Sequence, residues 1–454
     1  MSFLDTVVKS IPTVTPGPGD QEFSKKLQWT GIVVGLYFLL TITPIYGLQE
    51  NVLLEFQEFA ALLGASFGTL ATLGIGPIVT ASIVLQLLNG SGITNIDTQT
   101  QEGKQRFQGY KKLLTIFFIV LQSFLLVQLG GFVPEAGVDP LLLIVQLIIG
   151  GLFIIVMDEM VSKWGFGSGV SLFIAAGVSQ QIFIGLFNVL TAAGELSGIS
   201  GAPQGIIPEL FYFIFTGSLG AGQDLLLLLL TLGFTAVVFL MAVYLQAMKV
   251  EIPLSFGRVR GHGMRWPLNF LYANVIPIIF IGAIVANLQL LQGVLNSPIM
   301  DEIIPYLTAR TEAGATFVEA VVQQGGLDPV LLIQALTFLA FYAAGAAIFS
   351  IFWVETSGLN AKAQAEKLMR SGMQVPGFRR DKRVLERVLQ RYIGPITILG
   401  GLTIGLLAGL ADLTGAIGTG TGLLLAVMIV YRQYKQIAKE NLKAIHPALG
   451  KFME

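Results

Sequence analysis

The chain contains 454 residues, of which 54% are hydrophobic and 12% charged, and its mean hydropathy is +0.74. Soluble proteins carry about 25% charged residues, so this composition excludes a soluble protein and predicts one that crosses a membrane many times. The chain has no cysteine, which excludes disulfides, thiol nucleophiles and cysteine-based metal sites. Its formal net charge is -1 and its two histidines lie far apart in polar stretches, so we expect no metal site and no cofactor.

The N-terminal residues 1–26 are polar and rich in Pro and Gly, which is not the pattern of a cleavable signal. We expect them to form a cytoplasmic segment with one short surface helix. The rest of the chain is dominated by apolar stretches of the length, about 20 residues, that a membrane-spanning helix needs. Ten such stretches are present, at about 27–48, 71–89, 113–133, 138–157, 167–190, 224–247, 268–292, 328–353, 392–411 and 413–431.

Ten spans divide into two sets of five, and an odd number of spans per half turns the second half upside down relative to the first. The predicted fold is therefore an all-α polytopic membrane protein built from two inverted five-helix halves, although no sequence repeat is visible. The expected division is a first half, an external connector, a second half and a cytoplasmic tail, at 27–190, 191–223, 224–431 and 432–454.

The second span is broken where it begins. Gly74, Gly76 and Pro77 fall within four residues, and both residue types weaken a helix. Non-helical backbone at membrane depth is tolerated only where protein buries it or a cavity wets it. The break therefore indicates a pore or a binding site, with a local packing kink as the alternative. A short amphipathic piece, residues 52–66, precedes it.

The distribution of Lys and Arg predicts the orientation. With a cytoplasmic N-terminus, 26 of the 27 basic residues fall on the inner side and only Arg310 falls outside. Acidic residues divide equally between the two sides, so the bias lies in the positive charges. An even number of spans places the C-terminus in the cytoplasm as well.

Two inner loops, 248–267 and 354–391, are long and basic. Positive charge that sets topology explains basic loops in general. A docking surface for an anionic partner such as ribosomal RNA explains why four arginines gather beside glycine turns. Both interpretations remain open from these residues alone. The arginines are Arg258, Arg260, Arg379 and Arg380.

No Asp, Glu, Lys, Arg or His lies near the midpoint of a span, where ion-coupled transporters usually carry one. The polar residues within the spans are neutral, and such side chains often only join helices by hydrogen bonds. Thr80 and Asn287 nevertheless fall on spans that the inverted halves would relate, which favours a polar contact across a gate.

Several long motifs together resemble the SecY family, the central subunits of the Sec protein-conducting channel, in its archaeal form. The resemblance covers nearly the whole chain in order. The motifs are TLGIGPIVTASIVLQLL, DEMVSKWGFGSGVSLFIAAGVSQ, EIPLSFGRVRG, IFWVETSG and GTGTGLLL with IVYRQY.

The resemblance implies a central hourglass pore whose waist is a ring of apolar side chains. Such a constriction blocks ions by dewetting and can still yield to a passing polypeptide. By motif position the ring consists of Ile75, Val79, Val170, Ile174, Ile279 and Leu425.

The resemblance also assigns a plug, a lateral gate and a docking surface. The gate lies between spans two and three and spans seven and eight, with Thr80, Gln122 and Asn287 as its polar cluster; Gln122 replaces a residue that is often acidic in archaeal relatives. The four arginines of the basic loops would contact the ribosome. The plug is the piece 52–66, with Val52, Leu53, Leu54, Phe56, Phe59, Leu62 and Leu63 as its apolar residues.

The resulting prediction is a multi-pass protein of the cell membrane, not an enzyme, that passes unfolded secretory chains outward and membrane segments sideways into the lipid bilayer. The implied partners are SecE-type (gamma) and beta-type single-span subunits, the ribosome, and the nascent polypeptide with its signal sequence. The alternatives are a secondary transporter for a small solute, which shares inverted halves and a broken helix, and a non-transporting insertase or scaffold, which needs no apolar ring.

Overall fold

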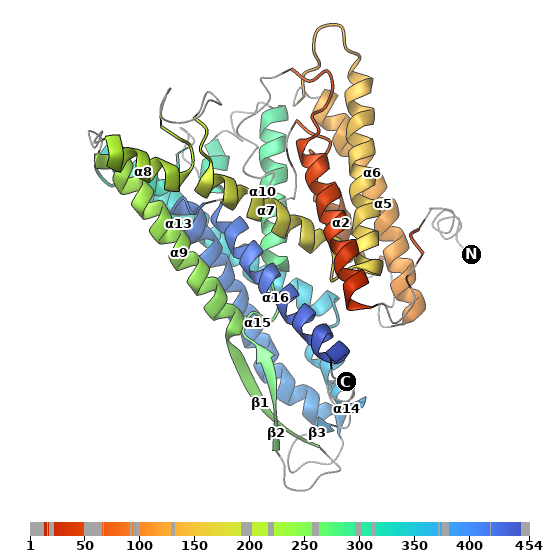
Figure 1. Ribbon diagram of the computed structural model, residues 1–454. Helices are drawn as coiled ribbons and strands as arrows, with labels where there is room; N and C mark the ends of the chain where they lie inside the picture. Colours follow the sequence, from red (N-terminus) through yellow and green to blue (C-terminus); the bar gives the residue numbers. More distant parts are fainter. Residues whose placement is uncertain are drawn as a thin grey trace.

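The structure is a computed structural model in which most of the chain folds into helices (Figure 1). Those helices form two groups, and a small sheet extends from one end of the molecule. The residues that the structure describes are 13–15, 17, 22–49, 66, 68–90, 93–94, 96, 100–128, 132–191, 202–216, 222–256, 263–295, 302–309, 315–370, 373–374, 381–417 and 419–445.

The first group packs around α6, which contacts α2, α5 and α7, while α4 packs on α5. The small residues Gly150 and Gly151 of α6 allow close approach, since a Cβ on Gly150 would lie 1.9 Å from the backbone oxygen of Leu70. The helices of this group are α2 (Phe23–Ile42), α4 (Gly76–Gly90), α5 (Gln101–Gln128), α6 (Pro140–Trp164) and α7 (Gly169–Phe187).

The second group packs around α15, which contacts α9, α10, α13 and α16. Along the chain, shorter helices alternate with the long ones. One of them is the amphipathic α14, whose Ala365 and Leu368 are buried against α15. The group consists of α8 (Ile206–Thr216), α9 (Gly222–Ala247), α10 (Ile276–Leu295), the 3-10 turn η2 (Ile304–Tyr306), α12 (Phe317–Gln324), α13 (Pro329–Thr356), α14 (Ala361–Arg370), α15 (Lys382–Leu413) and α16 (Gly420–Ile445).

Six of the described helices are long and apolar enough to cross a membrane, namely α5, α6, α7, α9, α13 and α15. Each expected span overlaps a helix, but several boundaries were wrong. The helix of the third span starts at Gln101 instead of 113, and that of the tenth runs from Gly420 to Ile445 instead of 413–431. Hydropathy detects the apolar part of a helix, whereas polar helix formers extend the helix beyond that part.

The fold is not purely α-helical, because three strands form a sheet in the order β2-β1-β3. Strands β1 (Lys249–Phe256) and β2 (Gly263–Asn269) are an antiparallel hairpin within the expected loop 248–267. Strand β3 (Met373–Gln374) comes from the expected loop 354–391. The hairpin also corrects the seventh span, which was expected from 268: the chain remains in β2 to Asn269, and α10 begins only at Ile276.

The described part of the N-terminal segment is held against α5 and α6. Glu159 accepts a hydrogen bond from the Val14 N–H at 3.0 Å and pairs with Lys112 at 2.5 Å. Lys163 donates to the Val14 carbonyl at 2.6 Å. The basic ends of these two helices and the segment before α2 therefore lie at the same end of the molecule. The short surface helix expected before residue 13 lies outside the described residues.

The contact between α13 and α15 depends on glycines. A Cβ on Gly405 would lie 2.6 Å from the carbonyl oxygen of Tyr342, an atom of helix backbone that cannot rotate away. We expect Gly405→Ala to lower the stability of the protein by about 1–3 kcal/mol through overpacking, measured as thermal unfolding in detergent. Gly233→Ala is the matched control, because a Cβ there has open space. Equal unfolding temperatures for the two variants would contradict this packing.

Candidate functional site

The break that begins α4 is built from a turn over residues 71–75. Gly74 has a left-handed φ of +49°, which a side chain rarely adopts, and its N–H donates to the Ala71 carbonyl at 2.9 Å. Ile75 follows in this turn and is fully buried, and Val79 lies one helical turn later, its N–H donating to the Ile75 carbonyl at 3.0 Å. The break thus places two apolar side chains in the interior, as expected from the sequence.

All six residues predicted for the ring lie in or against the main apolar core, which also contains residues of α2, α5, α6, α9, α13 and α15. They come from four places far apart in the chain: the start of α4, the start of α7, the start of α10 and the first turns of α16. Five of them are buried, and Val170 is half-buried and packed against the cluster. The exposed fractions are 0% for Ile75, 5% for Val79, 0% for Ile174, 8% for Ile279 and 0% for Leu425.

A second break, at the start of α10, repeats the geometry of the first. Asn274 has a left-handed φ of +62°, and its N–H donates to the Leu271 carbonyl at 3.1 Å, as Gly74 does to Ala71. Pro277 is the second residue of α10, as Pro77 is of α4. The N–H of Ile279 donates to the Val275 carbonyl at 3.2 Å. In this register Ile279 is equivalent to Val79, and Val275 is equivalent to Ile75.

Val275 is therefore a further candidate for the ring that the sequence interpretation did not include. It is 3% exposed and belongs to the same cluster as the six ring residues. The proline shared by the two helix starts is the signal that identifies it, because the residue two positions before each proline occupies the same place in both halves. One shared proline is too short a pattern to identify a sequence repeat, and only the matching backbone geometry at the two helix starts makes it informative.

The helices expected to form the gate are neighbours, since α4 packs against α5, α10 and α13. Thr80 donates its hydroxyl to the Gly76 carbonyl within its own helix, at 2.9 Å, and Gln122 is half-buried on α5. Within the described part of the chain, no hydrogen bond joins these two residues. The backbone of Asn287 lies in α10, and its side chain is outside the described part. The polar cluster of the gate therefore stays a prediction.

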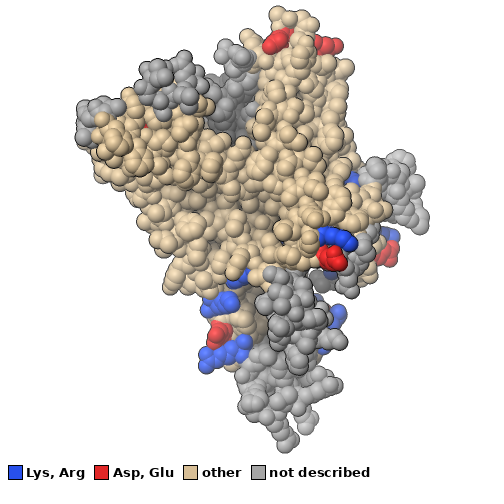
Figure 2. Space-filling model, in the orientation of Figure 1, with Lys and Arg blue, Asp and Glu red and all other residues tan. Residues whose placement is uncertain are grey.

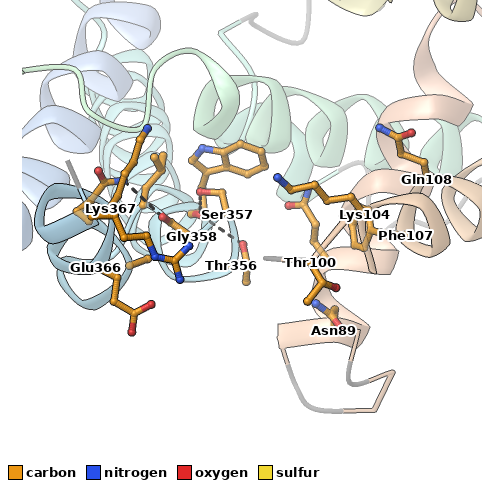
Figure 3. Close-up of a pocket in the computed structure, with 16 residues that line it drawn as sticks. Asn89, Thr100, Lys104, Phe107, Gln108, Thr356, Ser357, Gly358, Glu366 and Lys367 are labelled. Atoms are coloured by element: carbon orange, nitrogen blue, oxygen red, sulfur yellow. Dashed lines mark hydrogen bonds between the residues drawn. The ribbon is translucent and has the colours of Figure 1, made fainter. Parts of the chain in front are cut away.

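A cavity of about 970 Å³ is lined by the end of α4, the start of α5, the end of α13 and the helix α14. In Figure 3, Lys104 and Gln108 of α5 face Ser357 and Lys367 across this cavity. Glu366 also lines it and pairs with Lys382 of α15; that hydrogen bond lowers the pKa of the Glu366 carboxyl. The ends of α4 and α13 remain close beside this cavity, since a Cβ on Gly90 would lie 3.0 Å from Cγ2 of Thr356.

The plug residues 52–65 and the four docking arginines lie outside the described residues, but the residues beside those arginines are placed. Ser255 pairs with Gln374 and Phe256 with Met373, so the last residues of β1 lie beside the antiparallel strand β3. On the face in Figure 2, most Lys and Arg side chains lie toward the end that carries the sheet. A broad band above them has no charged side chain. Within the described residues no group of three or more His, Cys, Asp or Glu could hold a metal ion.

Residues 69–434 match the SecY family. The protein translocase subunit SecY of Methanothermobacter thermautotrophicus is 43% identical over 447 residues, which cover 95% of this chain and 94% of the relative. That of Methanocaldococcus jannaschii is 37% identical, with both chains covered completely.

Solved structures agree with the sequence relatives. A protein-conducting channel superposes with a TM-score of 0.81 at 36% identity, covering 99% of this chain and 100% of the other. Sec61 in the canine ribosome-channel complex from the endoplasmic reticulum gives a TM-score of 0.79 at 34% identity, with the same coverage. From the matched residues, the full-length relatives and the shared fold, the chain belongs to the SecY family of protein translocase subunits.

Proposed function

We propose that this chain is the pore-forming subunit of a protein translocase, which conducts unfolded polypeptides across the cell membrane and catalyses no reaction. The observation that carries the proposal is that the six predicted ring side chains, from four helix starts, all lie in or against the main apolar core. A narrow apolar passage excludes ions because water withdraws from it. It binds no particular sequence, because it has no charges and few hydrogen-bonding groups, and so it suits a substrate of any composition.

The proposed layout is ten membrane spans in two inverted halves, with both termini in the cytoplasm. Two observations support it. Nearly all Lys and Arg fall on one side of that layout. The starts of α4 and α10, which the inverted halves would relate, share a left-handed residue, a proline and the same backbone hydrogen bonds. The proposed ring includes Val275 in addition to the six residues carried over from the family.

The proposed lateral gate lies between α4 with α5 and α10 with α13. The packing of α4 on α10 and α13 supports this, because it places the two sides of the proposed gate in contact. An apolar segment in the pore would gain a few tenths of a kcal/mol for each Leu on moving into lipid, so about 20 such residues suffice to drive lateral release.

The proposed partners are the ribosome, the nascent chain with its signal sequence, and the SecE-type and beta-type subunits. Ribosome binding is supported by the similar Sec61 structure, which was solved in a ribosome-channel complex. It is supported further by the sheet, in which strands from the two basic loops pair with each other. The plug over residues 52–66 is proposed on the family resemblance alone.

A stalled nascent chain tests the proposal. Photoreactive residues placed at positions 75, 79 and 279 of the reconstituted complex should crosslink to a polypeptide held in the channel, and position 275 should do so as well. A photoreactive residue at Ile154 of α6 is the control, because Ile154 is 1% exposed in the same cluster but lies away from the proposed ring. Accumulation of a small solute in vesicles, with no crosslink at the four positions, would show a solute transporter instead.

A further inference from the structure

The first turn of α7 is held by an acid from the preceding helix. Asp158, near the end of α6, accepts a hydrogen bond from the Val170 N–H at 2.9 Å. The residue in the capping position of α7, Ser168, makes no such bond with its own side chain. Gly169 lies between them, and a Cβ there would be 2.5 Å from the Cα of Asp158. The start of α7 is therefore packed directly on the acid that caps it.

The first turn of α16 is held in the same way. Asp412, near the end of α15, accepts a hydrogen bond from the Thr421 N–H at 2.8 Å and a second from the Thr421 hydroxyl. Thr421 is 1% exposed. Gly420, the first residue of α16, packs on the chain at Ala411 and Asp412, since a Cβ there would lie 2.0 Å from the Ala411 carbonyl carbon and 2.4 Å from the Asp412 nitrogen.

The two arrangements match at the acid, the glycine and the ring residue, although in α16 the Gly422 N–H also donates to the Thr419 hydroxyl at 3.1 Å. In each, a glycine begins the helix, the next N–H donates to the acid, and a ring residue follows one turn later: Ile174 after Val170, and Leu425 after Thr421. Val170 is itself a predicted ring residue, so its backbone is bound to the acid directly. The two capped helices, α7 and α16, also pack on each other.

The other aspartate caps in the described part of the chain are local. Asp139 caps its own helix, α6, by accepting from the Leu141 N–H two residues later, and Asp328 does the same for α13 through Val330. Asp158 and Asp412 instead reach 12 and 9 residues along the chain to a different helix. A carboxylate at a helix N-terminus satisfies unpaired N–H groups and interacts favourably with the helix dipole. Here the same bond also fixes one helix relative to the next.

We propose that Asp158 and Asp412 are paired positioning residues that hold the first turns of α7 and α16, and thereby keep the apolar ring closed at rest. The inference rests on the proposed function, because it requires that the cluster at these two helix starts is the constriction of a pore. Each acid is bonded to the helix start that carries the ring side chains and acts through it.

The test is resting ion flux through the reconstituted complex. Asp158→Ala and Asp412→Ala are each expected to raise it about fivefold, since losing a helix cap shifts a conformational equilibrium by roughly that factor. Asp158→Asn and Asp412→Asn keep an acceptor oxygen but lose the charge, so a rise of about twofold is expected. If the alanine variants do not fold, the ion flux of the asparagine variants tests the inference.

Asp139→Ala and Asp139→Asn are the matched controls, because they remove the cap of a helix with no ring residue. Resting flux at the wild-type level in the Asp158 and Asp412 variants that fold, or an equal rise in the Asp139 variants, would overturn the inference and leave the acids with a role in stability only. Polypeptide translocation by the unmodified complex is measured in the same vesicles. Its absence would overturn the proposed function, whereas translocation with unchanged flux in the variants overturns this inference alone.

Discussion

Replacing Ile75 and Val79 together with glycine is expected to raise the resting ion conductance of the reconstituted channel by about tenfold or more. Both side chains are buried in the main apolar core, which also contains the predicted ring residues Ile174, Ile279 and Leu425. Dewetting depends on a narrow and apolar passage, and removing two branched side chains from one side makes it wider and exposes backbone polar groups. Conductance would be recorded across a planar bilayer in the absence of a translocating chain.

The same substitutions also create a cavity, which lowers stability by itself. Ile154→Gly controls for this effect, because Ile154 is equally buried in the same cluster but belongs to α6. We expect the control to unfold at a lower temperature and still conduct no more ions than the unmodified protein. If both variants leak equally, the ring positions have no special role and the cluster is an ordinary core.

Charge reversal at Arg258 and Arg379 is expected to weaken ribosome binding by roughly tenfold for each substitution, because each removes one charge-assisted contact and adds a repulsive one. The effect should shrink as salt rises, since contacts with phosphates release counterions on binding. These arginines lie outside the described residues. The strand pairs Ser255–Gln374 and Phe256–Met373 nevertheless join the two loops that carry them within one sheet.

Co-sedimentation of ribosomes with reconstituted vesicles at several salt concentrations measures this binding. Lys25→Glu is the control, because Lys25 is exposed on α2, far from the sheet in the chain, and its reversal changes the net charge by the same amount. Insertion of the variants into the membrane should be unaffected. Binding that stays unchanged at low salt would mean that the basic loops serve only to set the topology.

Much of the helical architecture could be predicted because transfer of a side chain from water to lipid is a local property of that side chain. A long apolar stretch such as that of α6 can therefore be recognised from the sequence. Counts of Lys and Arg in the loops suffice to propose an orientation. The ends of the helices were harder to predict from the sequence. The polar first turns of α5 and the polar end of α16 continue helices beyond the apolar part that hydropathy detects.

The strands were missed although a signal was present. Val250, Ile252, Leu254 and Phe256 alternate with polar residues and Pro253, which is the period of a strand. In a chain dominated by helices this short alternation was taken for a loop. The pairing of β1 with β3, more than 100 residues later, could not be read from either segment, because strand pairing depends on which segments meet in space.

The sequence by itself determined that the chain crosses the membrane many times, that the second span is broken at Gly74–Pro77, and that it resembles a protein-conducting channel. Only the tertiary structure decided that Ile75, Ile174, Ile279 and Leu425 share one buried cluster, and that Val275 belongs with them. It also decided which helix each of Asp158 and Asp412 caps. Hydropathy and glycine breaks are properties of a single segment. A ring and the acids that support it form only where several segments pack together.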